Sequence, residues 1–122
     1  MRSRNLAFSE TQHQFHFQLW FLTHESDGLL LYNGQNSNGD GDFVSLNLVS
    51  GRVHFTYDLG SGSVTLRSDG VAAPGRWHRV RAARTGREGT LRLDSGKVVR
   101  GAAVGALTEL NLELPLYLGG FR

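Results

Sequence analysis

The sequence predicts an all-β protein, an antiparallel β-sandwich of the jelly-roll type. Apolar and polar residues alternate with a period of two in several segments, which is typical of strands with one buried face. Glycine-rich turns separate these segments, and 16 of the 122 residues are glycine. No segment has the spacing of an amphipathic helix. Short strands joined by such turns, without crossover helices, favour a sandwich.

The first predicted strand covers residues 14–22. The apolar side chains that share one of its faces are Phe15, Phe17, Leu19 and Phe21. The opposite face carries His16, Gln18 and Trp20. This alternation predicts that the phenylalanine face is buried and that the other face meets the solvent.

A β-hairpin is predicted over residues 42–57. The inward positions of its two strands are Val44, Leu46, Leu48, Val53, Phe55 and Tyr57. Ser50 and Gly51 lie between the two strands and supply a tight reversal of the chain. This is the clearest local pattern in the sequence.

The remaining strands are short. They are predicted over residues 28–33, 63–67, 77–83, 90–94, 97–100 and 116–118. In the strand 77–83, Val80 is an inward position. Neither a linker nor an internal repeat interrupts the pattern, which predicts a single domain over residues 1–122.

Composition excludes several classes of protein. The 39% content of hydrophobic residues is too high for a disordered chain, and no apolar run approaches the roughly 20 residues of a membrane-spanning helix. The sequence has no cysteine, which excludes disulfides, thiolate metal sites and a cysteine nucleophile within these residues.

No catalytic motif is present. The sequence lacks G-x-S-x-G and H-E-x-x-H, and its five histidines are scattered. His13 and His16 are an odd number of residues apart, so on one strand they would point to opposite faces and could not share a metal ion. Glu109 and Glu113 are not marked as the acid and base of a glycosidase. We therefore expect a protein that is not an enzyme.

The net charge of +2 conceals an uneven distribution. Residues 23–75 carry a net charge of −4, whereas residues 76–100 carry +6. Twelve of the 13 basic residues are arginine, whose guanidinium group pairs bidentately with carboxylate, sulfate or phosphate. A charged outer face that only keeps the sheet soluble explains each arginine equally well, so both interpretations stay open.

Four blocks of the sequence together resemble the laminin G-like family, also called LNS domains. In order, these blocks are FQLWFLTHESDGLLLYNG, GDFVSLNLVSGRVHFTYDLGSG, GRWHRVRAARTGREGTLRLDSG and LNLELPLYLGG. The resemblance covers about residues 5–120. It implies the sandwich fold, an extracellular or cell-surface location, and a place within a larger multidomain adhesion or matrix protein. Family members usually continue past the last block, so the domain is expected to be truncated at its C-terminus.

The segment SNGDGD offers oxygen ligands for Ca²⁺. From spacing alone, Asn38, Asp40 and Asp42 could form one arm of a calcium loop, but the same residues are common in ordinary turns. The family resemblance implies a Ca²⁺ ion at the rim of the sandwich. Mapped onto this sequence, the ligands are the Asp42 carboxylate, the carbonyls of Leu59 and Glu109, and the Asn111 side chain. Asp40 is a possible substitute or outer ligand, and water would complete a weak site.

The basic segment is a second candidate surface. Arg79 and Arg81 lie two residues apart and leave a strand on the same face, and we expect Arg84 and Arg92 to join them. The resemblance implies sulfated or acidic glycans as ligands of such a surface. Nucleic acid is the competing polyanion, but the small net charge disfavours it.

The sequence thus predicts a calcium-binding extracellular module that recognises a protein receptor or an acidic glycan, without direct insertion into a membrane. Two alternatives remain. A jelly-roll lectin for neutral sugars would need an aromatic platform beside amide side chains, for which Trp20 and Asn33 are the candidates. A structural spacer between neighbouring domains would bind no ligand.

Overall fold

The computed structural model describes residues 1–11, 13–34, 42–60, 62–103 and 117–118. The strands in these ranges are β1 (Arg2–Glu10), β2 (Gln14–Leu22), β3 (Gly28–Gly34), β4 (Phe43–Val49), β5 (Arg52–Asp58), β6 (Ser63–Arg67), β7 (Trp77–Thr85), β8 (Glu88–Leu93), β9 (Val99–Ala102) and β10 (Tyr117–Leu118). The described part of the chain contains no helix, and therefore none that could cross a membrane.

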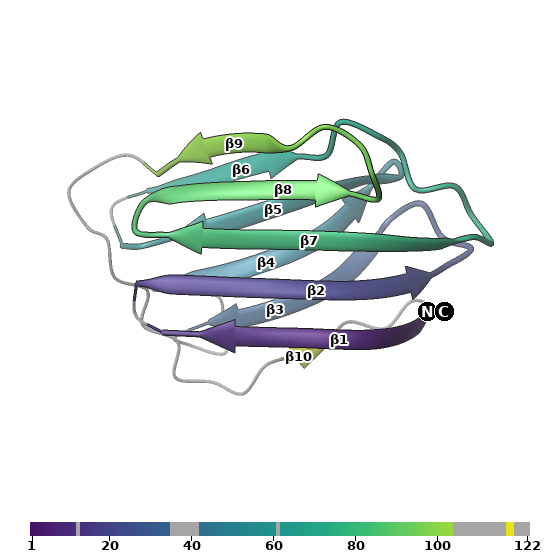
Figure 1. Ribbon diagram of the computed structural model, residues 1–122, viewed down its shortest axis with the longest axis horizontal. Coiled ribbons are helices and arrows are strands. Elements are labelled where there is room, and N and C mark those ends of the chain that lie inside the picture. The colour runs from purple at the N-terminus through teal and green to yellow at the C-terminus, as the bar shows by residue number, and fades with distance from the viewer. Residues whose placement is uncertain (12, 35–41, 61, 104–116, 119–122) are drawn as a thin grey trace.

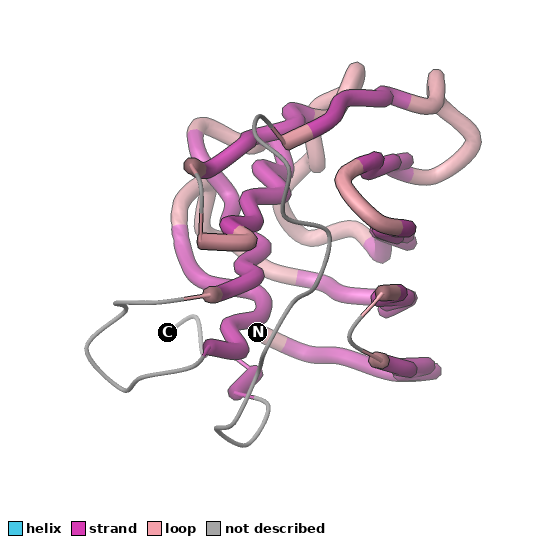
Figure 2. Tube along the Cα trace, turned by 90° about the vertical axis from the view of Figure 1, so that its left-hand side faces the viewer, coloured by secondary structure: helices cyan, strands magenta, loops and turns pink. Residues whose placement is uncertain are grey.

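The strands form two five-stranded antiparallel sheets (Figure 1). One sheet has the order β1-β2-β7-β8-β9, and the other has the order β10-β3-β4-β5-β6. The view turned by 90° shows the two sheets as facing layers (Figure 2). The predicted all-β sandwich of antiparallel sheets is confirmed.

The core lies between the sheets and consists of the residues that alternation predicted to point inward. On β2 these are Phe15, Phe17, Leu19 and Phe21, which are all buried. The inward residues of the predicted hairpin and Val80 are buried as well. The expected hairpin is the pair β4 and β5, joined by a turn in which Ser50 and Gly51 both have positive φ. Burial of this apolar surface is the main stabilising term of the fold.

Strand β1 was not predicted from the sequence. It pairs with β2 at the edge of its sheet, and most of its residues are exposed. Asn5 has a φ of 56°, and the register shifts between Arg4 and Ala7. An edge strand with one irregularity and little buried surface does not need an apolar face, so the period-two signal is absent.

Two glycines allow the sheets to approach closely. A Cβ at Gly101 on β9 would lie 2.5 Å from Cδ2 of Leu66 on β6, and one at Gly89 would lie 2.8 Å from Cε1 of Tyr57. In Figure 1, β9 and β6 accordingly run side by side at one edge of the sandwich. A side chain at Gly101 would require Leu66 to shift.

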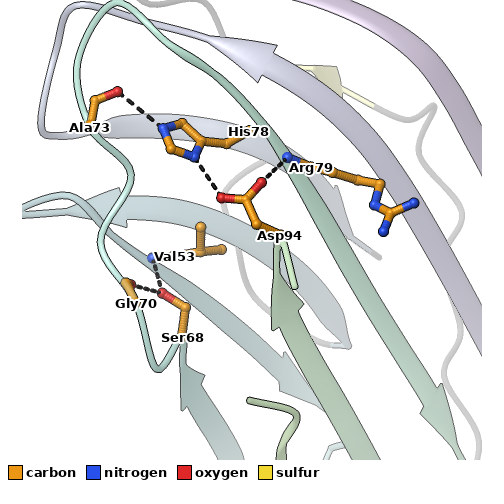
Figure 3. Close-up of polar contacts among 7 residues, drawn as sticks. All are labelled: Val53, Ser68, Gly70, Ala73, His78, Arg79 and Asp94. Atoms are coloured by element: carbon orange, nitrogen blue, oxygen red, sulfur yellow. Dashed lines mark hydrogen bonds and ion pairs between the residues drawn. The ribbon is translucent and has the colours of Figure 1, made fainter. Parts of the chain in front are cut away.

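A buried histidine anchors the segment that precedes β7 (Figure 3). His78 Nδ1 lies 2.7 Å from Asp94 Oδ2, and Nε2 lies 3.1 Å from the carbonyl oxygen of Ala73. Both ring nitrogens of His78 are therefore within hydrogen-bond distance of an oxygen atom. Asp94 Oδ1 also accepts a 2.8 Å hydrogen bond from the main-chain nitrogen of Arg79. Asp94 thus fixes the start of β7 without binding an arginine side chain.

Removing one core ring tests the packing of the sheets. Phe17 has an exposed fraction of 0%. Phe17→Ala should therefore lower the free energy of unfolding by about 3–5 kcal/mol, the usual cost of a large cavity. Urea unfolding followed by circular dichroism measures the change. Gln18→Ala, at the adjacent outward position, should change stability by only about 0.5 kcal/mol. Similar losses in the two variants would contradict the assigned faces.

Candidate functional site

The outward side chains of the sheet β1-β2-β7-β8-β9 form a surface rich in arginine and tryptophan, called here the arginine face. Its residues are Arg2, Arg4, Trp20, Trp77, Arg79, Arg81, Arg92 and Arg100. The strand register sets them in rows across the sheet, with Trp20 between Arg4 and Arg79. In the next row, Arg81 pairs directly with Arg92. The structure therefore places Arg79, Arg81 and Arg92 on one face, and their role in binding stays a prediction.

Cation–π contacts hold several of these guanidinium groups over aromatic rings. The Arg4 guanidinium carbon lies 4.2 Å from the centre of the Trp77 ring and 5.6 Å from that of Trp20. Arg79 also lies 5.6 Å from the Trp20 ring, and Arg2 lies 5.5 Å from that of Trp77. Each contact of this kind contributes about 0.5–1 kcal/mol at an exposed site. The tryptophans thus orient the arginines and are partly covered by them.

The arginine face is not neutralised by neighbouring carboxylates. The acidic residues of the basic segment 76–100 are Glu88 and Asp94. The carboxylate of Asp94 is engaged by His78 and by the main chain of Arg79, and the Arg79 guanidinium points away from it (Figure 3). Glu88 pairs in register with Thr85 and Ala102, away from the Arg81 row. Within the described ranges, no carboxylate makes an ion pair with Arg79, Arg81 or Arg92.

The crowding of side chains on the arginine face affects the pKa of Arg81. Burial lowers the pKa of its guanidinium, and the positive charges of Arg79 and Arg92 lower it further. Arg92 is held differently, because its Nε and Nη2 donate hydrogen bonds of 2.8 and 3.3 Å to the carbonyls of Gly96 and Ser95. Like charges gathered on one surface favour the binding of an anion between them.

Arg84 does not belong to this surface, so the prediction that it joins Arg79, Arg81 and Arg92 on one exposed face is wrong. It shares the inward side of β7 with Val80 and Ala82, and its exposed fraction is 1%. Its Nη1 donates a 2.6 Å hydrogen bond to the carbonyl of Gly86. Burial lowers the pKa of Arg84, whereas the nearby Tyr57, Glu10 and Asp42 raise it. Arg84 is an interior cation that no glycan chain could reach.

The predicted calcium rim is described only in part. Phe43 pairs with Asp58, so Asp42 and Leu59 are the next residues of the two strands at the same end of the β4-β5 hairpin. Asp58 Oδ1 accepts hydrogen bonds from the main-chain nitrogens of Gly60 and Gly62, at 2.7 and 3.3 Å, and so fixes the turn after Leu59.

Several predicted rim residues cannot be placed. Glu109, Asn111, Asn38 and Asp40 lie outside the described residues. In the portion that is described, no three histidine or acidic side chains cluster closely enough to hold a metal ion. Asp42 has an exposed fraction of 7% and interacts electrostatically with Arg84. A carboxylate and a nearby main-chain position fit the hard oxygen ligands that Ca²⁺ prefers, and they account for half of the predicted set.

The neutral-sugar platform is not assembled. Trp20 lies on the arginine face, whereas Asn33 belongs to β3 of the other sheet and has an exposed fraction of 4%. The amide nitrogen of Asn33 donates a 3.1 Å hydrogen bond to Glu10 inside the molecule. The two candidates for this lectin site are therefore far from a shared surface.

Arg2, Arg4 and Thr90 were not predicted as residues of this arginine-rich surface. Arg2 and Arg4 lie on the unpredicted strand β1. Thr90 pairs across β8 and β9, beside the Arg81 row, with Arg100, which belongs to the predicted basic segment 76–100. His16 was predicted only as a surface residue. Alternation within a strand cannot show which strands are neighbours, and this cross-strand register is what gathers the five residues.

The two tryptophans give a direct test of the stacking. They are the only tryptophans in the sequence, and both lie under Arg4. Arg4→Ala should therefore increase the quenching of intrinsic fluorescence by acrylamide, since the rings lose a covering group. Arg67→Ala, on the opposite sheet, is the matched control and should leave quenching unchanged. Equal quenching of the Arg4 variant and the unmodified protein would contradict the stacked geometry.

Comparisons with known proteins agree with this architecture. The family model of the Laminin G domain matches residues 21–122. The chain is 44% identical over 114 residues to the basement membrane-specific heparan sulfate proteoglycan core protein of Mus musculus, a match that covers 93% of this chain and 3% of that protein. It is 38% identical over 104 residues to pikachurin of Homo sapiens, covering 85% of this chain and 10% of that protein.

A solved structure supports the same assignment. Domains LG4-5 of the mouse laminin alpha1 chain superpose with a TM-score of 0.81 and 32% sequence identity, covering 93% of this chain and 30% of that one. The chain thus spans a small part of the length of each relative and less than a third of this structure. With its two antiparallel sheets and the match over residues 21–122, the chain belongs to the laminin G domain family.

Proposed function

We propose that this domain is an extracellular, non-enzymatic recognition module of a larger multidomain protein, and that its arginine face binds an acidic, sulfated glycan. The relatives supply the context, since they include basement membrane and laminin proteins many times longer than this chain. The observation that carries the proposal is the grouping of Arg79, Arg81 and Arg92 on one face without a carboxylate partner in the described part of the chain.

Solvation alone is a weaker explanation of this surface. A sheet face that only needs solubility commonly interleaves both signs of charge, because like charges at directly opposed positions are destabilising. Here Arg81 faces Arg92 directly, and the carboxylate of Asp94, which follows β8, contacts His78 instead. The repulsion is relieved by a polyanion, whose sulfate groups accept charge-assisted hydrogen bonds from guanidinium groups.

Heparin chromatography tests the glycan proposal. The double variant Arg79→Ala with Arg81→Ala should elute at lower salt than the unmodified protein, since each lost contact should reduce the dependence of log affinity on log salt by roughly one. The control removes the same charge from the other sheet, through Arg52→Ala with Arg67→Ala. Loss of Arg2 and Arg4 is unsuitable as a control, because both lie on the arginine face. Equal loss of retention in the two double variants would mean that only diffuse positive charge is sensed.

We further propose a weak Ca²⁺ site at the rim, with the Asp42 carboxylate and the carbonyl of Leu59 as two of its ligands. The β4-β5 register, which makes these residues neighbours, supports it. The family resemblance adds the Glu109 carbonyl and the Asn111 side chain. Such a site, with one carboxylate, suits the millimolar calcium of the extracellular space.

Calcium-dependent thermal stability tests the rim. A ligand that binds only the folded state raises the melting temperature by mass action, so millimolar Ca²⁺ should stabilise the unmodified protein relative to chelator. Asp42→Ala should abolish the calcium-dependent difference, whatever its effect on the basal melting temperature. Asp69→Ala, at an exposed position, should retain it. Identical melting curves of the unmodified protein with chelator and with Ca²⁺ would refute the site.

A further inference from the structure

A hollow lies on the outer face of the sheet, beside the paired Arg81 and Arg92. It has a volume of about 190 Å³ and is lined by His16, Arg81, Ala82, Ala83, Thr90, Leu91, Arg92 and Val98. Two rows of the sheet form it. One row contains Arg81 and Arg92, and the next contains His16, Ala83 and Thr90. The small side chain of Ala83 leaves the space between them open.

Four of the eight residues that line this hollow carry side-chain hydrogen-bond donors, and the other four are apolar. Arg81 provides a guanidinium group, and Arg92 retains Nη1 after its Nε and Nη2 bind the carbonyls of the following turn. Thr90 adds a hydroxyl group and His16 adds an exposed imidazole ring. None of the lining residues is acidic. Donors that converge from three neighbouring strands, with no acceptor of opposite charge, form a receptor for an oxyanion.

The adjoining hollow provides an internal contrast. It is lined by Glu88, Gly89, Thr90, Arg100, Gly101 and Ala102, so it shares Thr90 with the first hollow but contains a carboxylate. An anion placed there would be repelled by Glu88. Of these two hollows on the same sheet, only the one beside Arg81 combines two guanidinium groups with an uncharged floor.

We propose that the hollow bounded by His16, Arg81, Thr90 and Arg92 binds one sulfate group of the acidic glycan and thereby sets the position of the chain on the arginine face. This inference rests on the proposed function and adds a specific subsite to it. A sulfate group presents three terminal oxygens in a tetrahedral arrangement, so it can accept hydrogen bonds from Arg81, Arg92 and Thr90 together. A planar carboxylate presents two oxygens and satisfies fewer of these donors.

The sharpest test fills the hollow without changing any charge. Ala83→Leu should weaken the binding of a short sulfated heparin oligosaccharide by at least about tenfold, because the leucine side chain occupies the space of the sulfate. Loss of one charge-assisted hydrogen bond, worth about 1.5–3 kcal/mol, corresponds to such a factor. Calorimetric titration measures the affinity, and intrinsic tryptophan fluorescence is a second readout on the same face.

Ala7→Leu is the matched control. Ala7 lies on the same outer face, in register with Gln18 on the far side of β2 from Arg81. The same substitution there should leave the affinity within about twofold. Thr90→Val should lower the affinity while preserving the shape of the strand. An unsulfated oligosaccharide that keeps its carboxylates should bind the unmodified protein more weakly than the sulfated one, and inorganic sulfate should compete with the sulfated one.

The outcomes separate this inference from the proposed function. Retention of long heparin through Arg79 and Arg81, combined with unchanged affinity of Ala83→Leu for the short oligosaccharide, would overturn the subsite and leave the glycan proposal standing. Equal affinity for sulfated and unsulfated oligosaccharides would also overturn it. Failure of the unmodified protein to bind any sulfated chain would overturn both.

Discussion

The alternation of side chains along paired strands determines the inside and the outside of this domain together. Phe17 on β2, Val80 on β7 and Leu91 on β8 are buried. Because side chains alternate along a strand, the residues next to them in the sequence face the solvent. Antiparallel pairing then brings the outward residues of neighbouring strands into rows. The arginine face is therefore a consequence of the core, because any slip of one residue in β7 would exchange Val80 for Arg79 or Arg81 in the interior.

The interactions of the Asp94 carboxylate explain why the arginine face stays positively charged. Asp94 could form an exposed ion pair with an arginine of the same sheet, which would contribute about 0.2–1 kcal/mol. It instead accepts hydrogen bonds from the buried His78 ring and from the main chain of Arg79, and hydrogen bonds to charged groups contribute about 1.5–3 kcal/mol each. The stronger interactions hold the carboxylate at the end of the hairpin. The Arg79 guanidinium lies over the Trp20 ring, and that of Arg92 donates hydrogen bonds to turn carbonyls, so both keep their charge.

The sequence was sufficient to predict the strands that bury an apolar face. It was insufficient to predict which residues of neighbouring strands lie next to one another. The β2 strand and the β4-β5 hairpin were predicted because half of their residues are apolar and alternate. The edge strand β1 has no such requirement and was missed. Arg84 was misplaced although it has the same parity as Val80, because a charged residue was assumed to be exposed. The hollow beside Ala83 depends on cross-strand register, and the rim beyond Asp42 and Leu59 depends on residues outside the described ranges.

For the binding of a charged ligand, close contacts contribute more to the affinity than the net charge of the domain does. A net charge of +2 produces only a weak long-range field, and at physiological salt that field is screened over about 8 Å. A polyanion would therefore gain little from the approach and most from close contact with the arginine rows. In such contact, guanidinium groups already oriented by Trp20 and Trp77 lose less conformational freedom on binding than free side chains would. In the proposed function, the stacking of arginine on tryptophan would thus link the stability of the outer face to the binding of sulfated chains.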